Sequence, residues 1–143
     1  MTQRHFLLDE QSWAAFEAAI AAMARFRTIF GRDLQPSFVA ELYAAKELGL
    51  KVNLAGNEPG HDAVDRLGMR YQVKYRSPET LNVDVNNFDF DYLVLVNLDA
   101  EYRLRGMWRI TTEQAEAAFV WREKFRKYQA TQASVKRVAE TLA

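Results

Sequence analysis

Apolar residues in the first third of the chain recur with a helical period. Between residues 11 and 30 they fall at steps of three and four, as in an amphipathic helix. They are Trp13, Phe16, Ile20, Met23, Phe26 and Phe30. We predict that this stripe packs into the core and that Gly31 ends the helix. A second helix is expected from Pro36-Ser37 to Gly49, where glycine again marks a C-terminal stop.

The middle of the chain has the patterns of strands. Strands are expected over 51–54, 61–67, 70–76, 89–98 and 102–110. The second and third of these alternate and meet around Gly68, which predicts a β-hairpin. The run from Asp89 to Leu98 is almost continuously apolar, as in a strand covered on both faces, so it is the predicted central strand.

The last third of the chain predicts helices again. Thr111-Thr-Glu-Gln is typical of a capping box, and the apolar residues after it predict a helix continuing through Phe125. A last helix is expected over 134–142. The segment 77–88, with Pro78 and two asparagines, is expected to be a mobile loop.

This order of elements, helices followed by strands and then helices, predicts an α/β or α+β fold with one sheet between helical layers. A chain of 143 residues fits a single domain, 1–143. We place its core at about 37–110, its N-terminal helix at 11–30 and its C-terminal helices within 111–143.

Composition limits the chemistry. The chain has no cysteine and two histidines, so a thiolate or histidine-rich metal site is excluded and a metal would need oxygen ligands. The N-terminus has no signal-peptide core, and no apolar run is long enough to span a membrane. We therefore expect a cytoplasmic protein. Nineteen basic and nineteen acidic residues cancel, so net charge does not indicate nucleic-acid binding.

The predicted hairpin carries a candidate active site. Asp62 lies at the start of its first strand, while Gln72 and Lys74 are two residues apart on the second and share a face. Val73 faces the other side. Hydrolysis of a phosphodiester with a divalent cation needs hard oxygen ligands and a positive charge near the reacting phosphate. Lys74 can activate water or neutralise developing phosphate charge.

Residues 60–74, Gly-His-Asp-Ala-Val-Asp-Arg-Leu-Gly-Met-Arg-Tyr-Gln-Val-Lys, resemble the core of the PD-(D/E)XK nuclease superfamily. That superfamily includes restriction endonucleases and Holliday-junction resolvases. Its pattern is an Asp on one strand and an acidic-x-Lys triplet on the next, often with a Glu on the preceding helix. Two positions depart from the pattern, because His61 replaces the signature proline and Gln72 replaces the usual acid.

The resemblance, which extends over roughly 37–110, implies a restriction-endonuclease-like fold and a metal-dependent endonuclease. It implies that Asp62, Gln72 and the Val73 carbonyl would hold Mg²⁺, for which Mn²⁺ can substitute, and that Lys74 would be the catalytic lysine. Glu41 would be an auxiliary carboxylate. Its position at the edge of the apolar face of its helix also argues that it is paired, because an unpaired carboxylate there is costly.

Several neighbouring residues have two interpretations. Asp65 could replace Asp62 as a ligand but is nearer the turn, so we expect a turn residue. Arg76 either touches phosphate or is a solvated cation at a strand end. His61 is either a donor behind the metal ligands or a loop residue. Asp89 and Asp91 are expected at the entry of the central strand.

The C-terminal segment is rich in basic residues. Those proposed to grip the DNA backbone are Arg122, Lys124, Arg126 and Lys127. The alternative is the wet face of a helix. Trp121, Phe125 and Tyr128 fall at spacings of four and three, which predicts a packing stripe or an interface in a homodimer.

The sequence thus predicts a Mg²⁺-dependent DNA endonuclease without a small-molecule cofactor. The first alternative is a nuclease-like module that binds DNA or a protein partner without catalysis, with Gln72 marking a weakened metal site. The second is a structural α/β domain, in which Glu41, Asp62 and Lys74 would lie far apart.

Overall fold

The computed structural model describes residues 5–54 and 62–143. The chain divides into two compact units, residues 1–34 and 35–143, and each is described by itself. His61, for which the sequence offers the two interpretations above, lies outside the described residues.

The first unit is built around helix α1 (Glu10–Phe30), which confirms the predicted helix. Its N-cap is Asp9, whose carboxylate accepts a hydrogen bond from the Ser12 amide at 2.8 Å, and Gly31 ends it at φ 69°. The prediction that its stripe is core was wrong, since no residue of α1 is buried. A lone helix has no second layer of its own to cover an apolar face.

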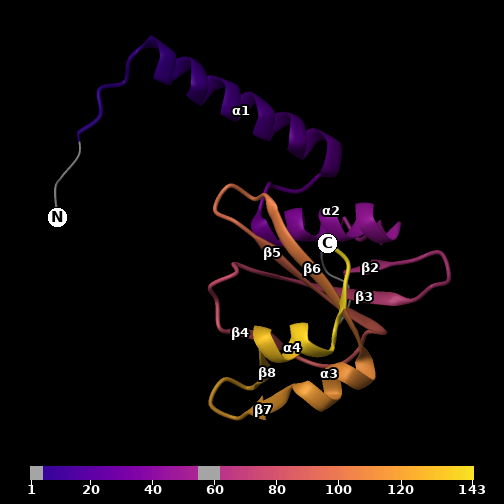
Figure 1. The fold of residues 1–143 in the computed structure, drawn as a ribbon. Helices are drawn as coiled ribbons and strands as arrows, with labels where there is room; N and C mark the ends of the chain where they lie inside the picture. The colour runs from indigo at the N-terminus through magenta and orange to yellow at the C-terminus, as the bar shows by residue number, and fades with distance from the viewer. Residues whose placement is uncertain (1–4, 55–61) are drawn as a thin grey trace. The chain divides into compact units, whose positions relative to one another are not determined.

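In its described residues, the second unit combines two sheets and three helices. Figure 1 shows how these elements are arranged. In order, the larger sheet contains β1 (Lys51–Val52), β2 (Ala63–Val64), β3 (Arg70–Arg76), β5 (Tyr92–Leu98), β6 (Leu104–Thr111) and β9 (Glu140–Thr141). The smaller contains β4 (Asn82–Val85), β8 (Lys127–Thr131) and β7 (Val120–Arg122). The helices are α2 (Pro36–Leu48), α3 (Thr112–Ala118) and α4 (Gln132–Val138). Among the strands that the structure describes, β3 and β5 pair in parallel and the other neighbours are antiparallel. The predicted mixed α/β class is confirmed.

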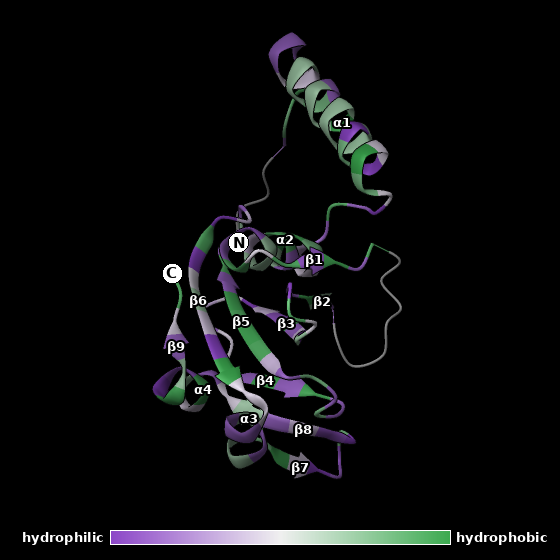
Figure 2. Ribbon diagram, turned by 90° about the vertical axis from the view of Figure 1, so that its right-hand side faces the viewer, coloured by the Kyte–Doolittle hydropathy of each residue, from purple (hydrophilic) through white to green (hydrophobic). Residues whose placement is uncertain are grey.

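The larger sheet has an apolar layer on each face. Helix α2 covers one face, where Ala40 and Ala44 pack with Val73, Val94 and Val96. Helices α3 and α4 and the smaller sheet cover the other. Strand β5 is central and buried along almost its whole length, as the sequence predicted, and Figure 2 shows it as a largely apolar strand. Side chains that alternate along β3 therefore enter two different environments.

The β2–β3 hairpin turns at Gly68, where the sequence placed it. The glycine adopts φ 80°, a conformation that residues with a Cβ rarely adopt. Asp65 organises this turn, because its carboxylate accepts the backbone N–H groups of Leu67 at 2.8 Å and Met69 at 3.0 Å. The prediction of Asp65 as a turn residue is confirmed.

We expect Gly68→Ala to destabilise the protein by about 1 kcal/mol, because alanine must adopt a left-handed conformation there. Urea unfolding monitored by circular dichroism measures the change. Leu67→Ala is the matched control, because Leu67 is 87% exposed in the same turn. Equal stabilities of the two variants would contradict the prediction.

Two predictions between residues 77 and 131 were wrong. Strand β4 lies within the predicted loop, and its Val83 and Val85 are buried. The capping box at Thr111 is present, but α3 ends at Ala118 and the chain continues into the β7–β8 hairpin. The expected C-terminal helical region is therefore helix, hairpin, helix and β9.

Both predictions were wrong because strands that are distant in sequence pair with each other. Strand β8 lies against β4, which is about 45 residues earlier, so each strand is stabilised by a partner that its local pattern does not reveal. The Trp121 and Tyr128 rings do pack together, with centroids 5.0 Å apart, but as a cross-strand pair rather than a helical stripe.

Candidate functional site

The hairpin brings three of the predicted site residues together. Asp62 immediately precedes β2, and its Oδ2 accepts hydrogen bonds from the Val73 amide at 2.8 Å and from Gln72 Nε2 at 3.1 Å. The Asp62 amide in turn donates to the Tyr71 carbonyl at 2.8 Å. The carboxylate is therefore fixed against β3 by both main chain and side chain. The alternative of a structural α/β domain predicts that Glu41, Asp62 and Lys74 lie far apart, but Asp62 and Lys74 are close enough to interact electrostatically.

Lys74 follows Gln72 by two residues on β3. Its side chain lies on the side of the larger sheet that the smaller sheet covers. Burial lowers the pKa of the Lys74 ammonium, and the negative charges of Asp84 and Asp62 oppose that shift. Lys74 is therefore a partly buried amine within electrostatic range of two carboxylates. A lysine in such a place is a candidate for a functional role.

Asp84 is a residue that the sequence reasoning missed. It lies on β4, and its carboxylate contacts Arg76 Nη2 at 3.5 Å and Lys127 Nζ at 3.6 Å. Together with Lys74, these side chains form a group that we name the Asp84 cluster: Lys74, Arg76, Asp84 and Lys127. The signal that could have revealed Asp84 is the alternation in Asn82-Val83-Asp84-Val85. The two valines are buried on one face of the strand, and Asp84 lies on the opposite face.

The Asp84 cluster joins the candidate hairpin to the basic C-terminal segment. Arg76 is not a solvated strand-end cation: it is partly buried, and its Nε donates to the Asn82 carbonyl at 3.1 Å. Lys127 opens β8, and the other predicted DNA contacts lie on the β7–β8 hairpin that leads into it. These are Arg122, Lys124 and Arg126, all of them exposed. The basic residues thus lie on a β-hairpin, not on a helix.

Glu41 is buried on α2, with 6% of its surface exposed. The sequence placed Glu41 at the edge of the apolar face of its helix, and the structure buries it there. Its helix neighbours Ala40 and Ala44 pack with Val73, whereas Gln72 and Lys74 alternate to the opposite side of β3. The apolar layer therefore lies between Glu41 and the hydrogen-bonded group of Asp62, Gln72 and Val73.

The oxygen atoms around Asp62 match a weak Mg²⁺ site. The Val73 carbonyl lies on the same edge of β3 as its amide, which donates to Asp62. Turning the Gln72 amide would present Oε1 in place of Nε2. Mg²⁺ often uses one or two carboxylates and keeps several waters, so this donor set fits a hydrated ion. Among residues 5–54 and 62–143, no three His, Cys, Asp or Glu side chains cluster as a metal cage.

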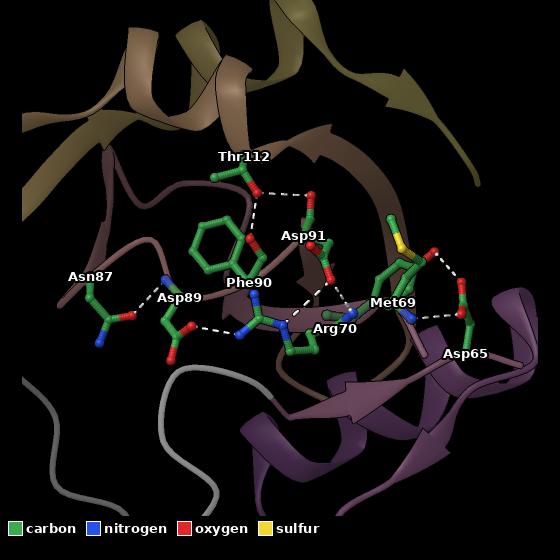
Figure 3. Close-up of polar contacts among 9 residues, drawn as sticks. Asp65, Met69, Arg70, Asn87, Asp89, Phe90, Asp91 and Thr112 are labelled. Carbon is green, nitrogen blue, oxygen red and sulfur yellow. Dashed lines mark hydrogen bonds and ion pairs between the residues drawn. The ribbon is translucent and has the colours of Figure 1, made fainter. Parts of the chain in front are cut away.

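Asp89 and Asp91 have structural roles at the entry of β5, as predicted (Figure 3). Asp89 pairs with Arg70 Nη1 at 2.6 Å, and Asp91 accepts the Arg70 amide at 2.8 Å. The Thr112 hydroxyl donates to the main-chain carbonyls of Phe90 and Asp91. These bonds tie the starts of β3, β5 and α3 together, so both carboxylates already have partners.

Comparison with family models and with curated proteins assigns no function to this chain. No family model matches the chain, and no curated protein is significantly similar to it. Within the described ranges, no helix is both long and apolar enough to cross a membrane.

Proposed function

We propose that this chain is a Mg²⁺-dependent nuclease that hydrolyses phosphodiester bonds of DNA, with the restriction-endonuclease-like fold. One observation carries the proposal: Asp62, Gln72 and Val73 are hydrogen-bonded at the hairpin, and the desolvated Lys74 follows on the same strand. The order of elements supports it, because the helix of Glu41 precedes the hairpin and the buried strand β5 follows.

Each residue has a role in this proposal. Asp62, Gln72 Oε1 and the Val73 carbonyl would hold the ion, which supplies Lewis acidity and a more acidic bound water. Lys74 would orient the attacking water and accept its proton as an uncharged amine, or as an ammonium it would neutralise charge that develops on the phosphate. Glu41, on the α2 side of the sheet, would have the role of auxiliary carboxylate only as far as the resemblance implies it. Partial burial of Lys74 would strengthen its interaction with a phosphate oxygen.

DNA would approach along the Asp84 cluster and the β7–β8 hairpin. Lys74, Arg76 and Lys127 outnumber the single carboxylate of Asp84, so this part of the surface carries net positive charge. Arg122, Lys124 and Arg126 extend the positive charge along the hairpin. Contact with phosphates requires such clustering and carries no base specificity by itself.

The second candidate function is a nuclease-like module that binds DNA without cleaving it. The observation that favours it is that Asp62 is already satisfied by two donors from β3, one of them the Gln72 amide. A glutamine at that position attracts a cation less than a carboxylate would. Such a module would keep the scaffold and the basic hairpin.

The two candidates are separated by a cleavage assay on supercoiled plasmid and labelled duplex with Mg²⁺ or Mn²⁺. For the nuclease we expect metal-dependent nicking by the wild type, abolished by EDTA. Asp62→Ala should reduce it about 100-fold or more, because it removes the charged ligand. Asp65→Ala is the matched control, since it removes a nearby carboxylate that serves the turn.

DNA binding without cleavage by the wild type, with both metals, would favour the binding module. Equal cleavage by wild type and Asp62→Ala would show that the activity does not come from this site.

A further inference from the structure

Helix α1 presents an apolar face that its own unit leaves uncovered. Four large side chains on it are about half exposed: Trp13 47%, Phe16 50%, Ile20 50% and Met23 49%. At 100° per residue they share one stripe, on which Arg27 also lies, while Glu17 lies at its edge. Arg25 points to the opposite side. The stripe is longer than the scattered exposed apolar residues usual on a protein surface.

The charges of α1 are divided between its two ends. Glu10 and Glu17 lie in the first half, and Arg25 and Arg27 in the second. A parallel pair of such helices would place like charges together, whereas an antiparallel pair brings each acidic half against a basic half. The charge pattern therefore complements a second copy of the same helix in the antiparallel direction.

The spacing of the stripe fits one antiparallel register. When two copies cross between residues 21 and 22, Ile20 of each meets Met23 of the other, and Phe16 of each meets Arg27 of the other. Glu17 of one copy then lies almost level with Arg27 of the other. The two differ by one residue, or about 1.5 Å along the helix axis. Apolar side chains fill the centre, and the opposite charges flank it.

We propose that α1 is a self-association element, through which two copies of this chain pair as antiparallel helices. The occupant of the stripe is the second copy, because the same residues supply both the apolar layers and the complementary charges. This arrangement is isologous, so each Glu17–Arg27 contact occurs twice. The proposal is independent of the nuclease assignment.

The test measures the mass of the full chain by analytical ultracentrifugation over about 5–200 µM. We expect the wild type to move from a monomer of 16.5 kDa towards twice that mass. Glu17→Arg and Arg27→Glu should each weaken the dimer about tenfold, since two attractive contacts become repulsive. The double variant restores opposite charges and should return the dissociation constant to near the wild-type value.

Arg25→Glu is the matched control, because it changes the charge by the same amount on the opposite face and should leave the dimer intact. Glu17→Arg keeps the intramolecular Arg27–Asp33 ion pair of 2.9 Å, so the two single variants test the contact independently. A monomer at every concentration would overturn the proposal. So would equal weakening by Arg25→Glu, or a double variant that remains as weak as the single ones.

Discussion

Replacing Asn97 by alanine is expected to lower the stability of the protein by about 3 kcal/mol, roughly 10 °C in melting temperature. Asn97 lies on β5 with 1% of its surface exposed. Its Nδ2 donates to Gln132 Oε1 at 2.8 Å and to the Arg76 carbonyl at 3.1 Å, and its Oδ1 accepts from Lys136 Nζ at 2.8 Å. One amide therefore joins β3, β5 and α4.

The loss of stability is large because Asn97→Ala leaves several hydrogen-bonding groups without a partner. Gln132, which is also buried, loses the donor to its Oε1, and the Arg76 carbonyl loses one as well. A buried polar group without a partner costs more than the bond itself was worth. Gln132 also donates through Nε2 to the carbonyls of Ser77 and Thr80, so the loss extends to the connection between β3 and β4.

Differential scanning calorimetry measures this change. Asn87→Ala is the matched control: Asn87 is exposed, and its Oδ1 accepts one hydrogen bond, from the Asp89 amide at 2.9 Å. We expect the control to melt within a few degrees of the wild type. If Asn97→Ala behaved in the same way, the buried amides would not hold these elements together.

Lys74→Met should have opposite effects on activity and stability. Methionine keeps most of the apolar stem of the side chain and removes the charge. If Lys74 serves the reaction, DNA cleavage falls about 100-fold or more. The melting temperature should equal or exceed that of the wild type, because burial already disfavours the ammonium, as its lowered pKa indicates.

This pair of readouts distinguishes a functional lysine from a structural one. Cleavage of plasmid and a thermal melt are measured on the same preparation. Lys46→Met is the control, because Lys46 is exposed on α2 and its removal changes the net charge equally. A marked loss of stability in Lys74→Met would assign the lysine a structural role, through its charge interactions with Asp84 and Asp62.

Much of the candidate site could be predicted from local sequence. Gly68 and Asp65 define the turn, and the alternation of β3 places Gln72 and Lys74 on one side and Val73 on the other. Once the turn is fixed, the register brings Asp62 beside β3. The bonds from Gln72 and Val73 to Asp62 follow from short-range geometry that a sequence pattern encodes.

The alternation of residues 82–85 is a local signal for a strand that carries Asp84, but it does not predict which residues form the Asp84 cluster. Asp84 and Lys127 are distant in sequence, and they meet because β4 pairs with β8. Strand β4 is four residues long between polar loops, and β8 follows a hairpin whose aromatic spacing imitates a helix. Their stability comes from partners far along the chain, which no local period records.

The sequence by itself determined the elements whose signals are local: α1 and α2 with their glycine stops, the capped start of α3, the hairpin and the buried strand β5. Only the tertiary structure decided where α3 ends, that residues 82–85 form a strand, and which charges surround Lys74. Local signals suffice where hydrogen bonds close within a helix or a turn. Strand pairing and the burial of a charge depend on distant residues, so they are settled only when the chain packs.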